Sequence, residues 1–295
     1  MSDYLKLHFV ILLWGSTAVL GNLIELSATQ LVLYRSVLAT GLLFFFLGRH
    51  AKVAPSTAML LILNGGLLGA HWIFFFLAVK VANVSICMIA MATISFWTAL
   101  LEPLLVRSCR FQWINLLLGL VVLLGIYSIF RSESQFHYGL GVGVIGAILA
   151  TLFSIANGRL ATRASEQAVV MYEMAGAAIV CGATLIISEM FGLGLASDRW
   201  GLTAWECLSL AALVLGGTLL AYRIYVSLLH RLSVFTINFA NNLEPIYGIT
   251  LGAICFGDHR YLGIDFYFGA VIILSAVIAQ PWLAIRSRRK LQPLT

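Results

Sequence analysis

The most unusual polar residues of this 295-residue chain lie in one apolar stretch, residues 238–252, with the sequence NFANNLEPIYGITLG. Glu244 and Pro245 interrupt a run that is otherwise typical of a membrane-spanning helix. A carboxylate in hydrocarbon costs about 2.5 to 3.5 kcal/mol on insertion scales, and a proline removes one backbone donor. The stretch therefore favours a helix that lines a polar cavity, and interrupted helices at mid-membrane depth are where transporters bind substrates and coupling ions.

Glu244 is the best candidate for a proton site or a substrate site. A carboxylate in low-dielectric surroundings is costly to keep charged, so it can take up a proton and link protonation to the side on which a cavity opens. A nearby arginine would keep it charged and favour binding of an ammonium group instead. Asn241 lies one helical turn earlier on the same face, and its amide can bind a polar or zwitterionic ligand or hydrogen-bond a neighbouring helix.

Five weaker candidates for the same cavity are Trp14, Arg35, His71, Trp72 and Tyr222. Arg35 is about seven residues inside its span, too deep to reach water easily, so it needs either a ligand or a buried acidic partner. His71 can shuttle protons or bind substrate, although a core histidine bonded to a backbone carbonyl is the commoner arrangement. The aromatic residues can line a subsite or simply pack.

Glu102, Glu173 and Arg223 also lie in apolar segments, and we assign them to structural ion pairs. Glu102 is about five residues, or roughly 7 to 8 Å, from the end of its helix and so lies near water. Removal of one member of a buried pair typically costs about 3 to 5 kcal/mol. Loss of activity at such a position would therefore not by itself show a role in transport.

The composition identifies an all-α membrane protein, because 61% of the residues are hydrophobic and 10% are charged, against about 25% charged in soluble domains. Ten spans of about 20 residues fit the chain and leave no room for a soluble catalytic domain. The expected spans are 8–24, 28–47, 57–79, 85–106, 112–129, 139–158, 167–188, 204–229, 234–256 and 263–284.

The sequence lacks the motifs of enzymes and metal proteins. There is no GxSxG or HExxH pattern, so we do not expect an enzyme. The five cysteines are scattered without a CxxC motif or a histidine cluster, so no metal, disulfide or other cofactor is expected. The first apolar segment has no cleavage site after it and is expected to stay in the protein as a helix of a bacterial-type inner membrane.

The net charge of +6 is explained by membrane orientation. With the N-terminus in the cytoplasm, twelve basic residues lie on the cytoplasmic side and four on the other, which is a clear positive-inside bias with both termini cytoplasmic. The four are Lys80, Arg131, Arg199 and Arg260. The basic tail, residues 286–295, is expected to contact anionic lipid rather than nucleic acid.

The two halves of the chain resemble each other. SATQLVLYRSVLA, which starts at Ser27, aligns with SEQAVVMYEMAGA, which starts at Ser165, and this alignment makes Arg35 equivalent to Glu173. Five spans per unit is an odd number, so the second unit must be inverted in the membrane. We expect two inverted five-helix repeats, residues 1–132 and 138–285, and such pseudo-symmetry is a usual basis of alternating access.

WGS in the first span, YR in the second, the half-length repeat and NNLEPIYGITLGAICFGD in the ninth together resemble the EamA-type transporters of the drug/metabolite transporter superfamily. The resemblance covers nearly the whole chain, with Asp258 in place of the glutamate that often follows Gly257. It implies a basket of ten helices in which spans 1, 3, 4, 6, 8 and 9 surround a central cavity and spans 5 and 10 are peripheral. It also implies export of amino acids or other small metabolites, coupled to protons in some members.

The expected function is therefore export of a small organic metabolite, first of all an amino acid, by alternating access with a proton as the candidate coupling ion. The partners would be the solute and the bilayer; the sequence leaves the oligomeric state open. A multidrug or organic-cation exporter, with Glu244 binding the cation, is the main alternative. A scramblase or an assembly factor is a further one, and it would tolerate Glu244→Gln.

Overall fold

The computed structural model describes residues 3–107, 111, 113–132, 134–232 and 234–290, and among these every regular element is helical. Seven segments are long and apolar enough to cross a membrane, and three shorter helices are also apolar, namely 117–129, Glu244–Phe256 and Ile264–Ala276. The chain is thus a multi-pass membrane protein. The helices are α1 (Asp3–Asn22), α2 (Ala28–Leu47), α3 (Pro55–Val81), α4 (Val84–Met91), α5 (Ile94–Leu105), α6 (Trp113–Ser132), α7 (His137–Leu160), α8 (Glu166–Phe191), α9 (Ala204–Ala212), α10 (Ala221–Leu229), α11 (Val234–Ala240), α12 (Glu244–Phe256) and α13 (Ile264–Lys290).

Local sequence fixes several helix ends. Ser27 caps α2 in a reciprocal capping box with Gln30, and Thr203 caps α9 in the same way with Glu206. The α8 helix ends at Gly192 and α12 at Gly257, both in the left-handed conformation that glycine adopts without steric cost. These signals separate the spans from loops that are short, apart from the one between α8 and α9.

Three of the expected spans are interrupted rather than continuous. Residues 84–105 form α4 and α5 with a break between them. In residues 204–229, α9 and α10 are joined by η4 (Leu213–Leu220), a π-helical segment. In residues 234–256, a short 3-10 turn, η5 (Asn241–Leu243), separates α11 from α12. The α13 helix continues to Lys290, through the first residues of the segment expected as a tail.

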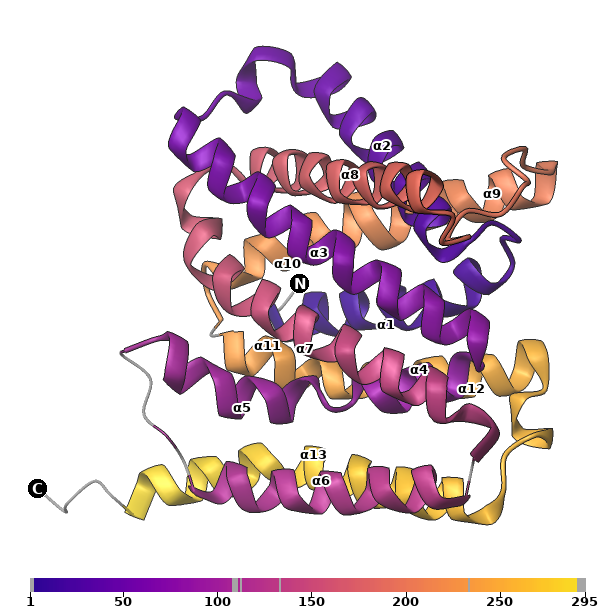
Figure 1. Ribbon diagram of the computed structural model, residues 1–295. Coiled ribbons are helices and arrows are strands. Elements are labelled where there is room, and N and C mark those ends of the chain that lie inside the picture. The colour runs from indigo at the N-terminus through magenta and orange to yellow at the C-terminus, as the bar shows by residue number, and fades with distance from the viewer. Residues whose placement is uncertain (1–2, 108–110, 112, 133, 233, 291–295) are drawn as a thin grey trace, which may run out of the picture.

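The helices run roughly alongside one another in stacked layers (Figure 1). The α3 helix packs against both α7 and α8, and α2 packs on α8. At one edge of the bundle α6 and α13 lie side by side and pack mainly on each other (Figure 1). The centre of the molecule is therefore built from the remaining helices.

The contact between α3 and α8 is unusually close. A Cβ atom on Gly65 would lie 2.0 Å from the backbone oxygen of Glu173, and one on Gly69 would lie 2.8 Å from the Cα of Ala177. Glycines four residues apart let two helix backbones approach in this way. The close approach sets the rotation of α8, and with it the direction of the Glu173 side chain.

Candidate functional site

A cavity lies at the centre of the bundle and brings together all seven residues that the sequence singles out for a binding site. They come from α1, α2, α3, α10, η5 and α12, and are Trp14, Arg35, His71, Trp72, Tyr222, Asn241 and Glu244. The cavity holds about 710 Å³ of space outside protein atoms, part of it open to solvent. None of the described residues of α6 or α13 lines it.

Arg35 is buried, with 2% of its surface exposed, and no described acidic residue pairs with it. Its Nε donates a hydrogen bond of 2.6 Å to Oγ1 of Thr218, and Nη2 donates to the carbonyl of Gly217 at 3.3 Å. The guanidinium carbon lies 3.7 Å from the centre of the Trp72 ring, a cation–π contact. These neutral contacts orient the guanidinium at the cavity wall without cancelling its charge.

The π-helical segment η4 supplies the acceptors that hold Arg35. The N–H of Ala221 donates to the carbonyl of Gly216, five residues earlier. The Gly217 carbonyl accepts from Arg35 and also from Nε1 of Trp14 at 3.2 Å. Wide helical turns of this kind occur often at functional sites. Here one carbonyl bridges α1 and α2 beside the cavity.

On the α12 side of the cavity the polar groups are left open. Glu244 is half-buried and lines the cavity, and no hydrogen bond or ion pair joins its carboxylate to a described residue. Oδ1 of Asn241 is buried and likewise has no described partner. Neither Arg35 nor Arg223 pairs with Glu244, so the cavity holds a carboxyl group with unused hydrogen-bonding capacity.

Two glycines that follow Glu244 at intervals of four residues, Gly248 and Gly252, pack against a neighbouring helix. A Cβ on Gly248 would collide with Met88, and one on Gly252 would lie 3.0 Å from the Cβ of Val84, so both positions face α4. The side chain of Asn242 lies outside the described part of the structure.

His71 is bonded to a backbone carbonyl, which is the commoner arrangement for a core histidine. Its Nδ1 lies 2.9 Å from the carbonyl oxygen of Gly146, and because a carbonyl can only accept, Nδ1 carries the proton. The ring also lies 6.0 Å from that of Phe75. The free Nε2 can then accept a hydrogen bond, while the α7 contact fixes the ring at the cavity wall.

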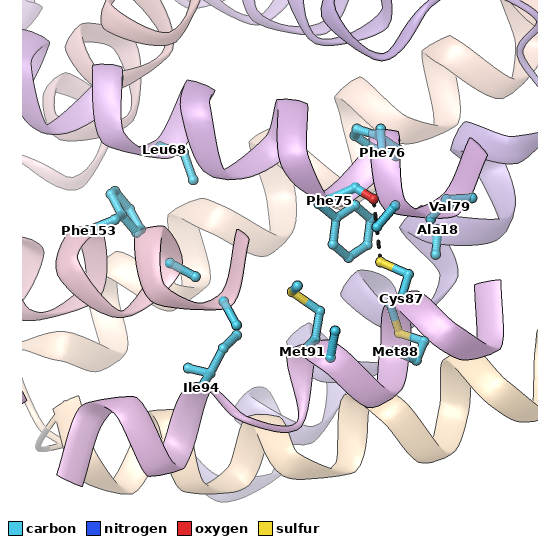
Figure 2. Close-up of a cluster of buried hydrophobic side chains, with 14 of the residues drawn as sticks. Ala18, Leu68, Phe75, Phe76, Val79, Cys87, Met88, Met91, Ile94 and Phe153 are labelled. Carbon is cyan, nitrogen blue, oxygen red and sulfur yellow. Dashed lines mark hydrogen bonds between the residues drawn. The ribbon is translucent and has the colours of Figure 1, made fainter. Parts of the chain in front are cut away.

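Part of the cavity wall is apolar. Figure 2 shows Leu68 and Phe75 of α3 with Ile94 of α5 and Phe153 of α7, and all four line the cavity. The same view shows the thiol of Cys87 donating to the Phe75 carbonyl at 3.4 Å. This surface suits an apolar or aromatic part of a ligand.

Glu173 is wholly buried, but its described partners are neutral, so the expected ion pair is wrong for this residue. Asn64 of α3 donates to Oε1 at 2.7 Å, and the hydroxyl of Tyr222 donates to Oε2. Tyr222 in turn accepts from Nδ2 of Asn157 at 2.9 Å. The rotation of α8 against Gly65 directs Glu173 toward α3 and α10 rather than toward Arg35.

The other two residues assigned to ion pairs lie away from the cavity. Nε of Arg223 is 3.7 Å from Oε2 of Glu166, so Arg223 does form an ion pair. The pair is not buried, because 56% of the arginine side chain is exposed. Glu102 is half-buried near the end of α5.

Several cavity residues were not anticipated from the sequence. They include Thr17, Phe75, Phe153, Ser154, Tyr225 and Asn238. Ser154 donates to Oδ1 of Asn238 at 3.0 Å, and Asn238 donates to Thr98 at 3.0 Å. The only sequence signal for this chain of hydrogen bonds is that the asparagine and the serine lie inside apolar helices.

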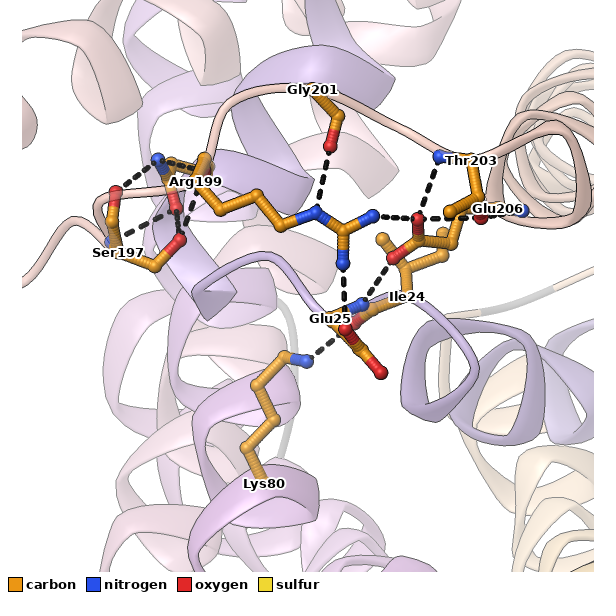
Figure 3. Close-up of polar contacts among 9 residues, drawn as sticks. Ile24, Glu25, Lys80, Ser197, Arg199, Gly201, Thr203 and Glu206 are labelled. Carbon is orange, nitrogen blue, oxygen red and sulfur yellow. Dashed lines mark hydrogen bonds and ion pairs between the residues drawn. The ribbon is translucent and has the colours of Figure 1, made fainter.

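A polar cluster ties together the ends of α1, α3 and α9, and we call it the clasp (Glu25, Lys80, Arg199, Thr203 and Glu206; Figure 3). Arg199 Nη1 lies 2.6 Å from Glu25 and Nη2 lies 2.5 Å from Glu206. Glu206 also accepts from the backbone N–H of Glu25 at 2.9 Å, and Lys80 donates to the carbonyl of Ile24 at 2.7 Å. The loop between α8 and α9 is thus fastened over the helix ends.

The comparisons with known proteins agree with this architecture. Residues 137–279 match the EamA-like transporter family. A solved structure titled "Crystal structure of protein" is 17% identical, aligns over 96% of this chain and 98% of its own, and has a TM-score of 0.65. At this identity the likeness shows a shared fold only. No curated protein matches the chain.

Proposed function

We propose that this chain, which belongs to the EamA-like transporter family by its match over residues 137–279, exports a small zwitterionic metabolite, first of all an amino acid. The family makes the chain a membrane transporter of the drug/metabolite kind, and members of this family are transporters rather than enzymes. The bacterial-type inner membrane is the proposed location. The clasp then lies on the outer side, because the positive-inside bias assigns Lys80 and Arg199 to it.

The observation that carries the proposal is the pair of unlike groups in the cavity wall. Arg35 presents a cation that no described carboxylate neutralises, and Glu244 presents a carboxyl group that no described cation neutralises. A ligand with its own carboxylate and ammonium complements both. Charge-assisted hydrogen bonds are roughly twice as strong as neutral ones. Such a ligand therefore gains binding energy from its carboxylate at Arg35 and from its ammonium at Glu244.

The apolar part of the cavity wall can bind the remainder of the ligand. Leu68, Phe75, Ile94 and Phe153 line the cavity and would contact an apolar side chain. Asn241, with its unpaired Oδ1, can accept from the ammonium beside Glu244.

The proposed architecture is ten spans in two inverted five-helix repeats, residues 1–132 and 138–285, with the basic tail at 286–295. It is supported by the seven long apolar segments and the three shorter ones. Two such repeats can exchange conformations around a central site, which is the usual course of alternating access.

Proton coupling is proposed at Glu244. An empty carrier that returns with Glu244 protonated and a loaded one that moves with the ammonium on Glu244 would exchange protons for solute. The carboxyl group lines the cavity and lacks a described partner, which is what a site shared by a proton and an ammonium requires.

An organic-cation exporter is the second candidate, favoured by the aromatic rings of Trp14, Trp72 and Phe75, which line the same cavity as Glu244. Arg35 argues against it, because a like charge in the same cavity disfavours binding of a cation.

The test is counterflow in proteoliposomes loaded with a panel of amino acids, organic cations and other metabolites, with and without a pH gradient. Wild type is compared with a folded Glu244→Gln, and with Glu166→Gln as a control at an exposed pair. We expect saturable flux of an amino acid in wild type. Glu244→Gln should abolish this flux or remove its dependence on pH, and Glu166→Gln should leave it unchanged. Flux of cations alone would favour the second candidate, and flux unchanged by Glu244→Gln would contradict the role of this carboxyl group.

A further inference from the structure

Glu173 is a buried ionisable group that the proposed transport cycle does not use. It is 0% exposed, on α8, behind the cavity wall. Its two oxygens are held by separate donors, Oε1 by Asn64 and Oε2 by the hydroxyl of Tyr222. Tyr222 is itself a cavity residue, so one side chain both lines the cavity and bonds the buried carboxyl group through its hydroxyl.

No described cation offsets a charge on Glu173. Arg35 of α2 is bonded to Thr218, and Arg223 of α10 is paired with Glu166 of α8. A buried carboxylate whose partners are all neutral is costly to keep charged. Glu173 therefore gains more from binding a proton than a carboxylate in an ion pair would.

The remaining titratable groups of the helices packed on this part of α8 are also engaged elsewhere. On α3, His71 bonds the carbonyl of Gly146 and Lys80 bonds that of Ile24 at the far end of the helix. On α10, the hydroxyl of Tyr225 lies 3.4 Å from Oγ of Ser154. On α2, the hydroxyl of Tyr34 donates to the carbonyl of Trp200.

The hydrogen bonds around Glu173 leave room for one more proton. Oδ1 of Asn64 and Oδ1 of Asn157 are both buried and lack described partners, whereas the amide nitrogens of both residues are used. The network therefore has two acceptor oxygens without described partners. A protonated Glu173 adds one donor, and Asn64 can receive it after its amide turns over, since the amide oxygen and nitrogen occupy similar space.

From this geometry we propose that Glu173 is a second proton-binding site of the carrier, reached from the cavity through the hydroxyl of Tyr222. A proton from cavity water is accepted on the Tyr222 oxygen while the tyrosine's own proton passes to Oε2 of Glu173. Release follows the reverse path, with no change in bonds between heavy atoms. The coupling of this proton to solute movement rests on the proposed function, whereas its binding does not.

The binding step is tested by infrared difference titration of the purified full-length protein in lipid nanodiscs, without substrate. We expect a carbonyl band of a protonated carboxyl group that fades as the pH rises, is lost in Glu173→Gln and persists in Glu244→Gln. Glu166→Gln, on the same helix but in an exposed pair, is the matched control and should leave the band unchanged. Identical spectra for wild type and Glu173→Gln across the folded pH range would overturn the proposal.

Tyr222→Phe keeps the test decisive should Glu173→Gln not fold. It preserves the ring but removes the hydroxyl bond to Oε2, so the band should shift in frequency and its exchange with deuterium should slow. An unshifted band with unchanged exchange would refute the path through Tyr222.

The coupling step is tested by the pH profile of counterflow. We expect Glu173→Gln and Tyr222→Phe to flatten the profile, which a merely structural bond would not do. A profile unchanged in both variants, in a carrier that shows flux, would refute the coupling. Absence of flux in wild type would count against the proposed transport function, while the infrared titration would still decide whether Glu173 binds a proton.

Discussion

The bond between Arg35 and Thr218 should contribute measurably to stability, because it joins α2 to η4 inside the bundle at 2.6 Å. Hydrogen bonds between membrane helices average about 0.6 kcal/mol, with a maximum near 1.7. Charge-assisted bonds are roughly twice as strong as neutral ones. Since Arg35 is 2% exposed, water cannot easily replace the lost acceptor, and we expect an interaction energy of about 1 to 2 kcal/mol.

The perturbation is a double-mutant cycle with Thr218→Val, Arg35→Met and both together. Thr218→Val also removes the bond from Oγ1 to the carbonyl of Leu213, but that loss is present in both backgrounds and cancels in the cycle. The assay is the free energy of unfolding of the purified protein in bicelles during titration with a denaturing detergent. Thr218→Val should cost about 1 to 2 kcal/mol less in the Arg35→Met background than in wild type.

An interaction energy below about 0.5 kcal/mol, the usual limit of additivity for independent sites, would refute this reasoning. It would mean that Arg35 finds another acceptor when Thr218 is lost, and that the π-helical segment does not hold the guanidinium.

Two further predictions concern stability. Arg199→Ala should destabilise the protein by about 1 to 3 kcal/mol, because it leaves the side chain of Glu206, which is 5% exposed, without its cation. Glu25→Gln should cost less than about 1 kcal/mol of stability, because the Glu25 side chain is 79% exposed. Both are read from the same unfolding titration, and equal losses would contradict the assignment. Gly65→Ala should separate α3 from α8 and lower the yield of monodisperse protein in size-exclusion chromatography, whereas Gly182→Ala, with nothing within 4 Å of its Cβ, should not; equal yields would show that the contact can relax.

The positions of the helices could be read from the sequence. The expected span 28–47 coincides with α2, and the expected span 204–229 begins with α9 and ends with α10. Runs of apolar residues bounded by Ser27, Thr203 and similar caps are strong local signals. The membrane also restricts the chain to elements that satisfy their own backbone groups.

The interruptions inside the spans could not be read in the same way. Hydrophobicity indicates which residues lie in the membrane rather than in water. It does not indicate the register of backbone hydrogen bonds within a helix. Pro245 signalled a disturbance, and the structure has it in the first turn of α12, where a missing N–H costs nothing. The π-helical turn at Gly216 and Gly217 had no comparable signal beyond the glycine pair itself.

Seven of the residues that line the cavity could be selected from the sequence, whereas the partners of these residues could not. A polar residue in an apolar helix must face a cavity or a partner, which is why Arg35 and Glu244 could be selected. Whether Glu173 meets a cation or a tyrosine depends on how α8 is rotated, and the approach of Gly65 decides that. Such contacts between distant parts of the chain leave no pattern in a single sequence.

The central claim, that one cavity binds a zwitterion through Arg35 and Glu244, is tested most directly by competition in counterflow. The competitors are an amino acid, its amide without the carboxylate, and the matching acid without the ammonium. In wild type we predict that the amino acid competes best. Arg35→Gln should remove its advantage over the amide, and Glu244→Gln its advantage over the acid. Equal competition by all three in wild type, or equal effects of both variants on both analogues, would contradict the account.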